Sequence, residues 1–344
     1  MKKILTLISL LLLTACGGGG GGGGSSSSAI TAITFTAWNQ VGSSGYPVQV
    51  KNFDIKAIQG DWATTSNSIT SVTNASAVSG ATLTINYSAA NTPTTATYTD
   101  NSLGETNTYD TIGAVRDGYW STYMNDIFYL AYDSAEDAAN IVGPNGGLFY
   151  VEPGITQASA GCSLYKCDTW LYQTFGFWYD DDSCTISSCP TNNNGNFGAF
   201  SFGNATAGSS VPTSGSGTFY GRAGGWFFDI PNGRVYTVAQ LFEATVNYAA
   251  RSIAVDTTGL TNYKTNFVTG VAGGNDDGLR WSGTLTYASG SADFTGAIST
   301  NGTYNMSGTA SGTFYGPLAT ELGGQFVLDS TNYKYSGAFG AYKQ

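Results

Sequence analysis

Four cysteines in the middle of the chain have the spacing of two local disulfide bonds. Cys162 and Cys167 lie five positions apart, and so do Cys184 and Cys189. Residues 169–179, between the two pairs, read as one strand that would span roughly 36 Å when extended. A disulfide bond joins Cα atoms within about 7 Å, so we expect Cys162–Cys167 and Cys184–Cys189 bonds unless this strand bends back at its glycine. A single zinc ion held by all four thiols is the alternative, which the geometry disfavours.

The chain contains no histidine, and this excludes several kinds of catalysis and metal binding. Ser-His-Asp and Cys-His nucleophiles both need an imidazole, as does any metal site built on histidine. A hydrolase without histidine would need two carboxylates that converge in a cleft. Five carboxylates of the second half are scattered singly along the predicted strands: Asp229, Glu243, Asp256, Asp293 and Glu321. We therefore predict no catalytic residues and no cofactor.

Two acidic stretches carry oxygen ligands of the kind that calcium prefers. Asp180-Asp181-Asp182 follows the aromatic strand, and Asn275-Asp276-Asp277-Gly278 lies in the second half. Neither has the spaced Asp-x-Asp-x-Asp-Gly pattern of a dedicated calcium loop. We interpret both as solvated turns and predict no metal site.

The first 28 residues predict an export signal and a tether. Two lysines precede a ten-residue apolar run, too short to span a bilayer as a helix, and the run ends in Leu13-Thr14-Ala15-Cys16. These four residues resemble a bacterial lipobox, which implies removal of residues 1–15 and acylation of Cys16, including palmitate. Several acyl chains anchor stably where one is marginal. An ordinary secretory signal with a chance cysteine is the alternative. Residues 16–28 continue as a Gly/Ser tether that spans roughly 20 Å.

Composition favours an all-β protein. Charged residues are 10% of the chain, well below the usual quarter, whereas glycine occurs 47 times. The net charge of -10 disfavours nucleic acid as a partner, since phosphate backbones would be repelled. Turn signals separate short apolar runs in residues 29–210, which predict strands at 30–38, 48–58, 81–87, 96–99, 126–132 and 147–151, with one short helix at 135–142.

The C-terminal part alternates with a period of two, as strands do. Trp281, Gly283, Leu285 and Tyr287, for example, alternate with serine and threonine. Ten strands are predicted in this part: 217–228, 235–241, 244–248, 252–256, 263–268, 280–287, 292–299, 306–315, 324–328 and 335–342. Glycine recurs inside them, which suits a tightly coiled small barrel.

Residues 312–326, GTFYGPLATELGGQF, and residues 337–340, GAFG, carry a resemblance to a known family. Together they resemble the C-terminal signature of transferrin-binding protein B-like surface lipoproteins. The resemblance implies a C-terminal eight-stranded antiparallel up-and-down β-barrel at 211–344, filled with side chains, after a β-rich handle-like domain at 29–210. Ten predicted strands exceed eight, so some must merge or be loop. Within the signature, Glu321 is expected to hydrogen-bond backbone at a barrel rim.

The resemblance also implies a function. Members are outer-membrane lipoproteins of Gram-negative bacteria, often surface-exposed, that bind a host protein or an iron or haem carrier for nutrient acquisition. The lipid would be the only membrane contact. Loop aromatics are the expected anchors of such recognition. The candidate ligand-binding residues are Trp120, Tyr123, Trp170, Tyr172, Phe177, Trp178 and Tyr179, with core packing as the alternative for each. A structural or adhesive envelope lipoprotein without a saturable ligand is the alternative function.

Overall fold

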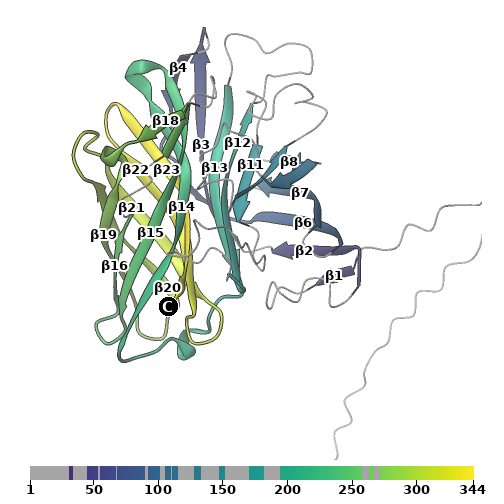
Figure 1. The fold of residues 1–344 in the computed structure, drawn as a ribbon, viewed down its shortest axis with the longest axis vertical. Helices are drawn as coiled ribbons and strands as arrows, with labels where there is room; N and C mark the ends of the chain where they lie inside the picture. Colours follow the sequence, from purple (N-terminus) through teal and green to yellow (C-terminus); the bar gives the residue numbers. More distant parts are fainter. Residues whose placement is uncertain are drawn as a thin grey trace, which may run out of the picture.

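The structure is a computed structural model, and its β-strands form three layers. It describes residues 31–33, 45–52, 55–66, 68–89, 92–100, 105–109, 111–114, 128–132, 147–151, 170–181, 194–257, 263–266 and 272–344. The predicted signal and tether, all five cysteines, the predicted helix at 135–142, and the candidates Trp120 and Tyr123 lie outside these ranges. Figure 1 shows a closed barrel, a sheet packed along its side, and a smaller sheet beyond. We call the two sheets together the handle.

The C-terminal layer is a closed antiparallel barrel of eight strands. Around the ring they are β14 (Ser216–Asp229), β15 (Arg234–Asn247), β16 (Ser252–Asp256), β19 (Trp281–Tyr287), β20 (Asp293–Thr300), β21 (Ser307–Tyr315), β22 (Glu321–Asp329) and β23 (Tyr333–Lys343). The ring closes because β14 pairs with both β15 and β23. A hairpin of β17 (Tyr263–Asn266) and β18 (Ala272–Asn275) extends from β15 outside the ring. The all-β class and the eight-stranded up-and-down barrel are confirmed.

Two differences explain why ten predicted strands become eight. The predicted strands 235–241 and 244–248 are two parts of the single strand β15, and 263–268 corresponds to β17, which lies outside the ring. The strand predicted at 252–256 has the observed bounds of β16. Short-range alternation therefore located the strands, whereas the ring itself depends on pairing between distant segments.

The sheet next to the barrel is the middle sheet. Its order is β4 (Ser68–Val72), β3 (Lys56–Thr65), β13 (Asn194–Gly203), β12 (Gln173–Asp181), β11 (Gly147–Val151), β10 (Phe128–Tyr132) and β9 (Thr111–Ala114), and β5 (Ser76–Val78) pairs with β3. The outer sheet has the order β1 (Thr31–Ile33), β2 (Val48–Asn52), β6 (Ala81–Ala89), β7 (Thr92–Asp100) and β8 (Glu105–Tyr109). The predicted strand 48–58 is in fact split between β2 and β3, which belong to different sheets.

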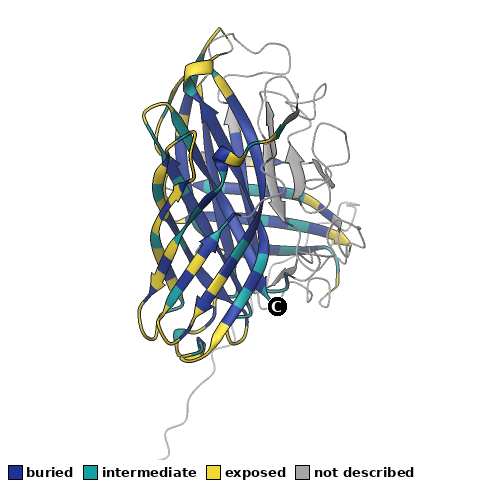
Figure 2. Ribbon diagram, turned by 60° about the vertical axis from the view of Figure 1, so that its left-hand side comes forward, coloured by how far each residue is buried: buried dark blue, intermediate teal, exposed yellow. Residues whose placement is uncertain are grey.

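Three hydrophobic clusters hold the layers together. One fills the barrel, one lies between the barrel and the middle sheet, and one lies between the middle and outer sheets. Figure 2 shows the barrel strands buried over much of their length, with exposed residues collected at the strand ends and on the side away from the handle. Each fully buried Leu, Phe or Val contributes about 1.5–3 kcal/mol, so the clusters bind the layers firmly.

Helical structure is minor in the part of the chain that the structure describes. It consists of three single 3₁₀ turns, η3 (Gly208–Ser210), η4 (Ile230–Asn232) and η5 (Asp277–Leu279). Within the same ranges, no helix has the length and apolar character needed to cross a membrane.

Candidate functional site

Strand β12, which carries three of the seven predicted ligand-binding aromatics, lies in the middle of the three layers. Phe177 and Tyr179 face the barrel, where their rings lie 5.4 and 5.3 Å from the ring of Trp226. Trp178 faces the other way, with its ring 4.8 Å from that of Tyr98 in the outer sheet. All three are core side chains, because the strand is covered on both faces.

Four of the candidate aromatics are thus core side chains, which is the alternative given above for each of them. The exposed fractions are 1% for Trp170, 0% for Phe177 and Trp178, and 3% for Tyr179. Tyr172 is half-buried at the edge of the contact between handle and barrel. A continuous apolar run, rather than an alternating one, is the signal that a strand is buried on both faces. Residues 174–179, Thr-Phe-Gly-Phe-Trp-Tyr, are such a run.

Glu321 at the start of β22 binds the handle through its carboxylate. Oε1 accepts hydrogen bonds from the backbone N–H groups of Leu171 at 2.6 Å and Tyr172 at 3.2 Å, and Oε2 accepts from Tyr172 at 3.2 Å. The expectation that Glu321 bonds backbone at a barrel rim is thus confirmed, and the backbone belongs to the handle. We call this contact region between handle and barrel the joint.

The environment of Glu321 alters its protonation. The side chain is 2% exposed. Burial raises the pKa of this carboxyl to about 8, against the backbone N–H groups of residues 171–173, which lower it. The increase in pKa from lost hydration exceeds the decrease from the N–H donors. The joint therefore contains a carboxyl that holds its proton near neutral pH.

Two glycines of the signature make room for handle side chains at the joint. The Nε2 of Gln173 donates to the carbonyls of Leu322, at 2.8 Å, and Ala341, at 3.2 Å. A Cβ on Gly323 would collide with the Gln173 amide, and one on Gly340 would collide with the Phe175 ring. The glycines of this part of the barrel therefore serve close approach by the handle, in addition to the coiling of the strands.

Further hydrogen bonds complete the joint. Trp226 Nε1 donates to the carbonyl of Trp178 at 2.7 Å, and the hydroxyls of Ser201 and Tyr315 lie 2.9 Å apart. The Thr206 hydroxyl donates to the carbonyl of Gly316 at 2.6 Å. With the apolar cluster around Trp226, these bonds make handle and barrel one packed unit.

The interior of the barrel is occupied by large side chains. Phe242 and Phe339 stack at 4.8 Å, and Trp281 lies 4.9 Å from Phe326. Gln240 accepts from the Tyr335 hydroxyl at 3.0 Å and donates to the carbonyl of Leu279 at 2.8 Å. A core of this kind makes the barrel a scaffold, as expected for eight strands.

The acidic stretch at 275–278 has a structural use. Asp276 accepts from the Gly278 N–H at 3.1 Å and from the Tyr304 hydroxyl at 2.6 Å, which fixes the turn before β19. Asp180 and Asp181 end β12, and Asp182 lies outside the described residues. Among the described residues, no three acidic, histidine or cysteine side chains gather as a metal site would need.

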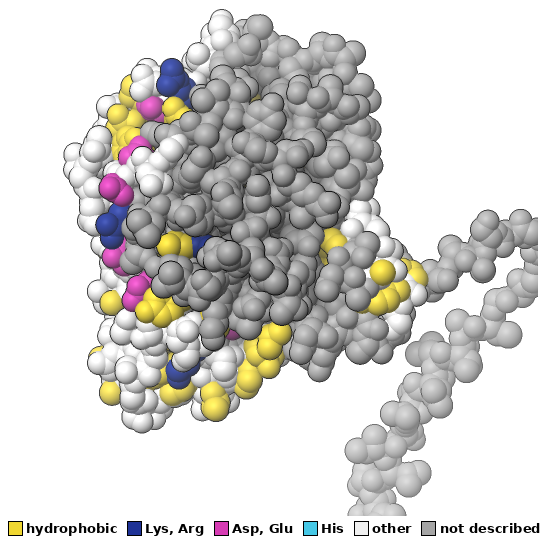
Figure 3. All heavy atoms as spheres, in the orientation of Figure 1, with side chains coloured by type: hydrophobic (Ala, Val, Ile, Leu, Met, Phe, Trp, Pro, Cys, Tyr) yellow, Lys and Arg dark blue, Asp and Glu magenta, His cyan; other side chains and the backbone are white. Residues whose placement is uncertain are grey.

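Aromatic and apolar side chains reach the surface at the two ends of the barrel. At one end, half-buried Tyr304 and Tyr333 lie 4.7 Å apart and cover Phe227. We call this pair the tyrosine rim. At the other end Leu318, in a turn with positive φ, is 64% exposed. The visible face in Figure 3 shows acidic and basic side chains interspersed along the barrel.

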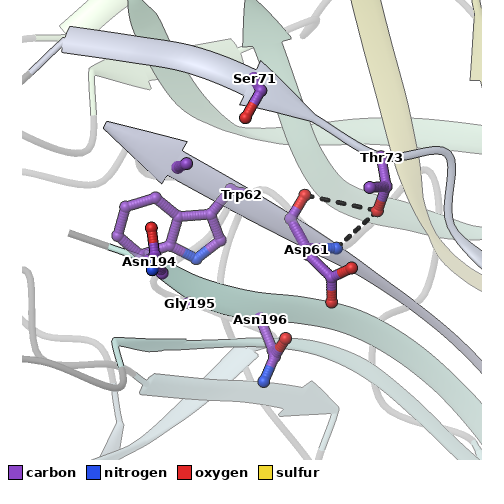
Figure 4. Close-up of a pocket in the computed structure, with 8 residues that line it drawn as sticks. Asp61, Trp62, Ser71, Thr73, Asn194, Gly195 and Asn196 are labelled. Carbon is purple, nitrogen blue, oxygen red and sulfur yellow. Dashed lines mark hydrogen bonds between the residues drawn. The ribbon is translucent and has the colours of Figure 1, made fainter. Parts of the chain in front are cut away.

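A polar pocket lies on the middle sheet, on the face turned away from the barrel. It has a volume of about 340 Å³. Figure 4 shows its eight lining residues, which come from β3, β4 and β13 and the turn after β4: Asp61, Trp62, Ala63, Ser71, Thr73, Asn194, Gly195 and Asn196. Sequence reasoning missed these residues. The Asn-rich sequence at 192–194 is typical of a turn, and nothing local indicates that β13, which begins at Asn194, pairs with β3.

Comparisons with known proteins identify the barrel. Residues 211–343 match the model of the C-lobe and N-lobe β-barrels of Tf-binding protein B. The C-terminal barrel is similar to the barrels of this family. The resemblance carried by residues 312–326 and 337–340 is confirmed. No curated protein matches the chain.

Solved structures that match the chain include transferrin-binding and lactoferrin-binding proteins. Transferrin-binding protein B from Haemophilus parasuis has 12% identity and a TM-score of 0.37, with 86% of this chain and 77% of that chain covered. The N-lobe of lactoferrin-binding protein B from Moraxella bovis has 12% identity and a TM-score of 0.34, with 52% and 77% covered. Transferrin-binding protein B from Neisseria meningitidis has 12% identity and a TM-score of 0.33, with 85% and 77% covered. The family assignment rests on the barrel match alone.

Proposed function

We propose that the protein is an outer-membrane lipoprotein, exposed at the cell surface, that binds a ligand and catalyses no reaction. The observation that carries this proposal is the match of residues 211–343 to the barrels of a binding protein. The lipobox at 13–16 supports anchoring through Cys16, and the Gly/Ser tether lets the folded part stand off the membrane.

The ligand class follows from the same family. Matched proteins are named for binding transferrin or lactoferrin, and we propose a host protein or an iron or haem carrier, taken for nutrient acquisition. A haem ligand would have no histidine to bind its iron, so a tyrosine would have to serve.

Recognition would use the ends of a rigid scaffold. Because the joint packs handle and barrel together, loops at the barrel ends keep fixed positions and lose little freedom on binding. The tyrosine rim and Tyr172 are the described aromatics best suited to contact a partner, since tyrosine gives large contact area with few rotatable bonds. Trp120 and Tyr123 remain candidates from the sequence.

Protease shaving of intact cells tests the surface location. An antibody to the barrel reads the signal before and after treatment. Its loss, with a periplasmic marker protein left intact, supports capture of an extracellular ligand. Protection until the outer membrane is opened would contradict surface exposure.

The alternative is an envelope lipoprotein with a structural or adhesive role. The low charge and the neutral hydroxyl-rich outer strands are compatible with it. Titration of the immobilised protein with host serum and secretion proteins separates the two functions. Saturable binding of one defined protein supports capture, and the Tyr304→Ala and Tyr333→Ala variants would then weaken it at least tenfold.

A further inference from the structure

The polar pocket on the middle sheet has an unusual place in the fold. Asp61 on β3 and Asn196 on β13 are directly opposite each other in register. Their neighbours Trp62 and Phe197 belong to the cluster on the barrel side, so Asp61 and Asn196 point the other way. The same face carries Phe200 and other residues that the outer sheet covers. The pocket therefore lies beyond the part of this face that the outer sheet covers.

The backbone beneath the pocket is held rigidly. Thr73 accepts a hydrogen bond from the Asp61 N–H through its hydroxyl, at 2.7 Å, and donates its own N–H to the Asp61 carbonyl at 2.9 Å. Trp62 stacks on Tyr179 at 4.9 Å, on the barrel side of the sheet. Both faces of this short stretch are thus held, so the backbone that carries Asp61 has a fixed position.

Two lining groups have no bond within the described part of the protein. The Asp61 carboxylate and the Ser71 hydroxyl make no hydrogen bond or ion pair with any described residue. Figure 4 shows the Asp61 carboxylate directed towards the strand that carries Asn196. A carboxylate only accepts, whereas a carboxamide and a hydroxyl both donate and accept. Together they present acceptors and donors within one small space.

The lining excludes other classes of ligand. It contains no lysine or arginine, so an anion such as phosphate would meet one negative charge and no positive one. It contains a single carboxylate, whereas calcium takes six to eight oxygens and favours several charged ones. A volume of about 340 Å³ lies at the lower end of the range for ligand pockets, which suits one small ring.

We propose that this pocket binds one neutral sugar residue, with the Asp61 carboxylate and the Asn196 amide hydrogen-bonded to adjacent hydroxyls of the ring. A vicinal diol both donates and accepts, and this matches a carboxylate beside a carboxamide. Ser71 supplies a third polar contact, and Ala63 an apolar patch for the ring carbons. The site is separate from the tyrosine rim and does not depend on the proposed capture function.

Saturation-transfer NMR on the whole mature protein tests the site. The probes are the methyl glycosides of glucose, galactose, mannose and N-acetylglucosamine at millimolar concentration, with n-butylamine as a charged probe. At least one glycoside should receive saturation from the wild type. Asp61→Ala and Ser71→Ala should weaken that binding at least tenfold and threefold respectively. Asp256→Ala on barrel strand β16 is the matched control and should leave it unchanged.

Each other outcome counts against the site. Absence of transfer to all four glycosides, or equal transfer with Asp61→Ala, overturns the proposal. Binding of n-butylamine but of no glycoside would also overturn the proposal. It would identify a binding site for an ammonium group, such as that of a partner's lysine. Thermal unfolding of each variant confirms that a loss of binding is not a loss of fold.

Discussion

Glu321→Gln should make the stability of the protein less dependent on pH, because it removes a carboxyl that the fold keeps protonated. The pKa of Glu321 rises from 4.5 to about 8 on folding, chiefly through burial. Between these values the folded state binds more protons than the unfolded state, so the free energy of unfolding falls as pH rises. The stabilisation is complete below pH 4.5 and is lost as pH passes 8.

The magnitude follows from the size of the shift. Each pKa unit is about 1.4 kcal/mol, so a shift of about 3.5 units gives about 5 kcal/mol over the whole window. From pH 5 to pH 8 the wild type should lose about 3.5 kcal/mol relative to the variant, because part of the stabilisation remains at pH 8. Glutamine keeps a carbonyl oxygen that can accept from Leu171 and Tyr172, and it carries no charge at any pH.

Urea unfolding at a series of pH values, followed by tryptophan fluorescence, measures this difference. Trp226 and Trp170 lie at the joint and report on its integrity. Glu243→Gln, on barrel strand β15 and only half-buried, is the matched control and should follow the wild-type curve. Parallel curves for wild type and Glu321→Gln would refute the reasoning. A wild type that gains stability with pH relative to Glu321→Gln would mean that the backbone N–H donors outweigh burial.

Three other predictions concern the joint, the surface and the cysteines. Gly323→Ala should cost about 1–3 kcal/mol, because its Cβ would displace the Gln173 amide; an unchanged melting temperature would contradict this. Burial alone would raise the pKa of Asp293, but hydrogen bonds from Lys56 and Thr313 and the charge of Lys56 hold it below its usual value. The stabilisation that this lowered pKa gives to the folded state is present above pH 3.8 and is lost as pH falls below it. The Lys56 and Asp293 side chains are 34% and 65% exposed, so solvent weakens their ion pair. A double-mutant cycle that combines Lys56→Met with a substitution of Asp293 should therefore give a coupling energy of no more than about 1 kcal/mol at neutral pH and none at pH 2. Peptide mapping without reduction should yield two linked peptides within residues 162–189, each from one local pair; a cross-linked pattern would show that the strand between them bends back.

The barrel strands could be predicted from the sequence because their information is local, whereas the closed eight-stranded barrel was implied by the resemblance of residues 312–326 and 337–340 to a known family. Alternation marked each strand, and the glycines inside the strands indicated tight coiling. The ring count could not be read in the same way, since β17 has an alternating pattern like its neighbours and only its pairing with β15 places it outside the ring. β13 was missed for a related reason. Its partners are β12 and β3, and the second lies more than a hundred residues away.

Binding residues were harder to predict than strands. Aromatic content alone led to Trp170, Phe177, Trp178 and Tyr179, all of which are core. A strand that is covered on both faces and a loop that binds a partner are both rich in aromatics. Composition alone does not distinguish the two. The polar pocket arises from cross-strand register between distant segments, which no local pattern of Asp61 or Asn196 reveals.

The family signature itself explains why a family match leaves the ligand open. Glu321 binds backbone of the handle, Gly323 and Gly340 admit handle side chains, and Gly316 accepts a hydrogen bond from Thr206. These residues determine how handle and barrel fit together. Because these four residues are committed to the joint, we expect specificity to come from other residues, at the barrel ends and on the handle. Substitution of the tyrosine rim should therefore change what is bound and lower stability only through the contacts with Phe227 and Asp276, whereas substitution of the signature should change the unfolding curve first.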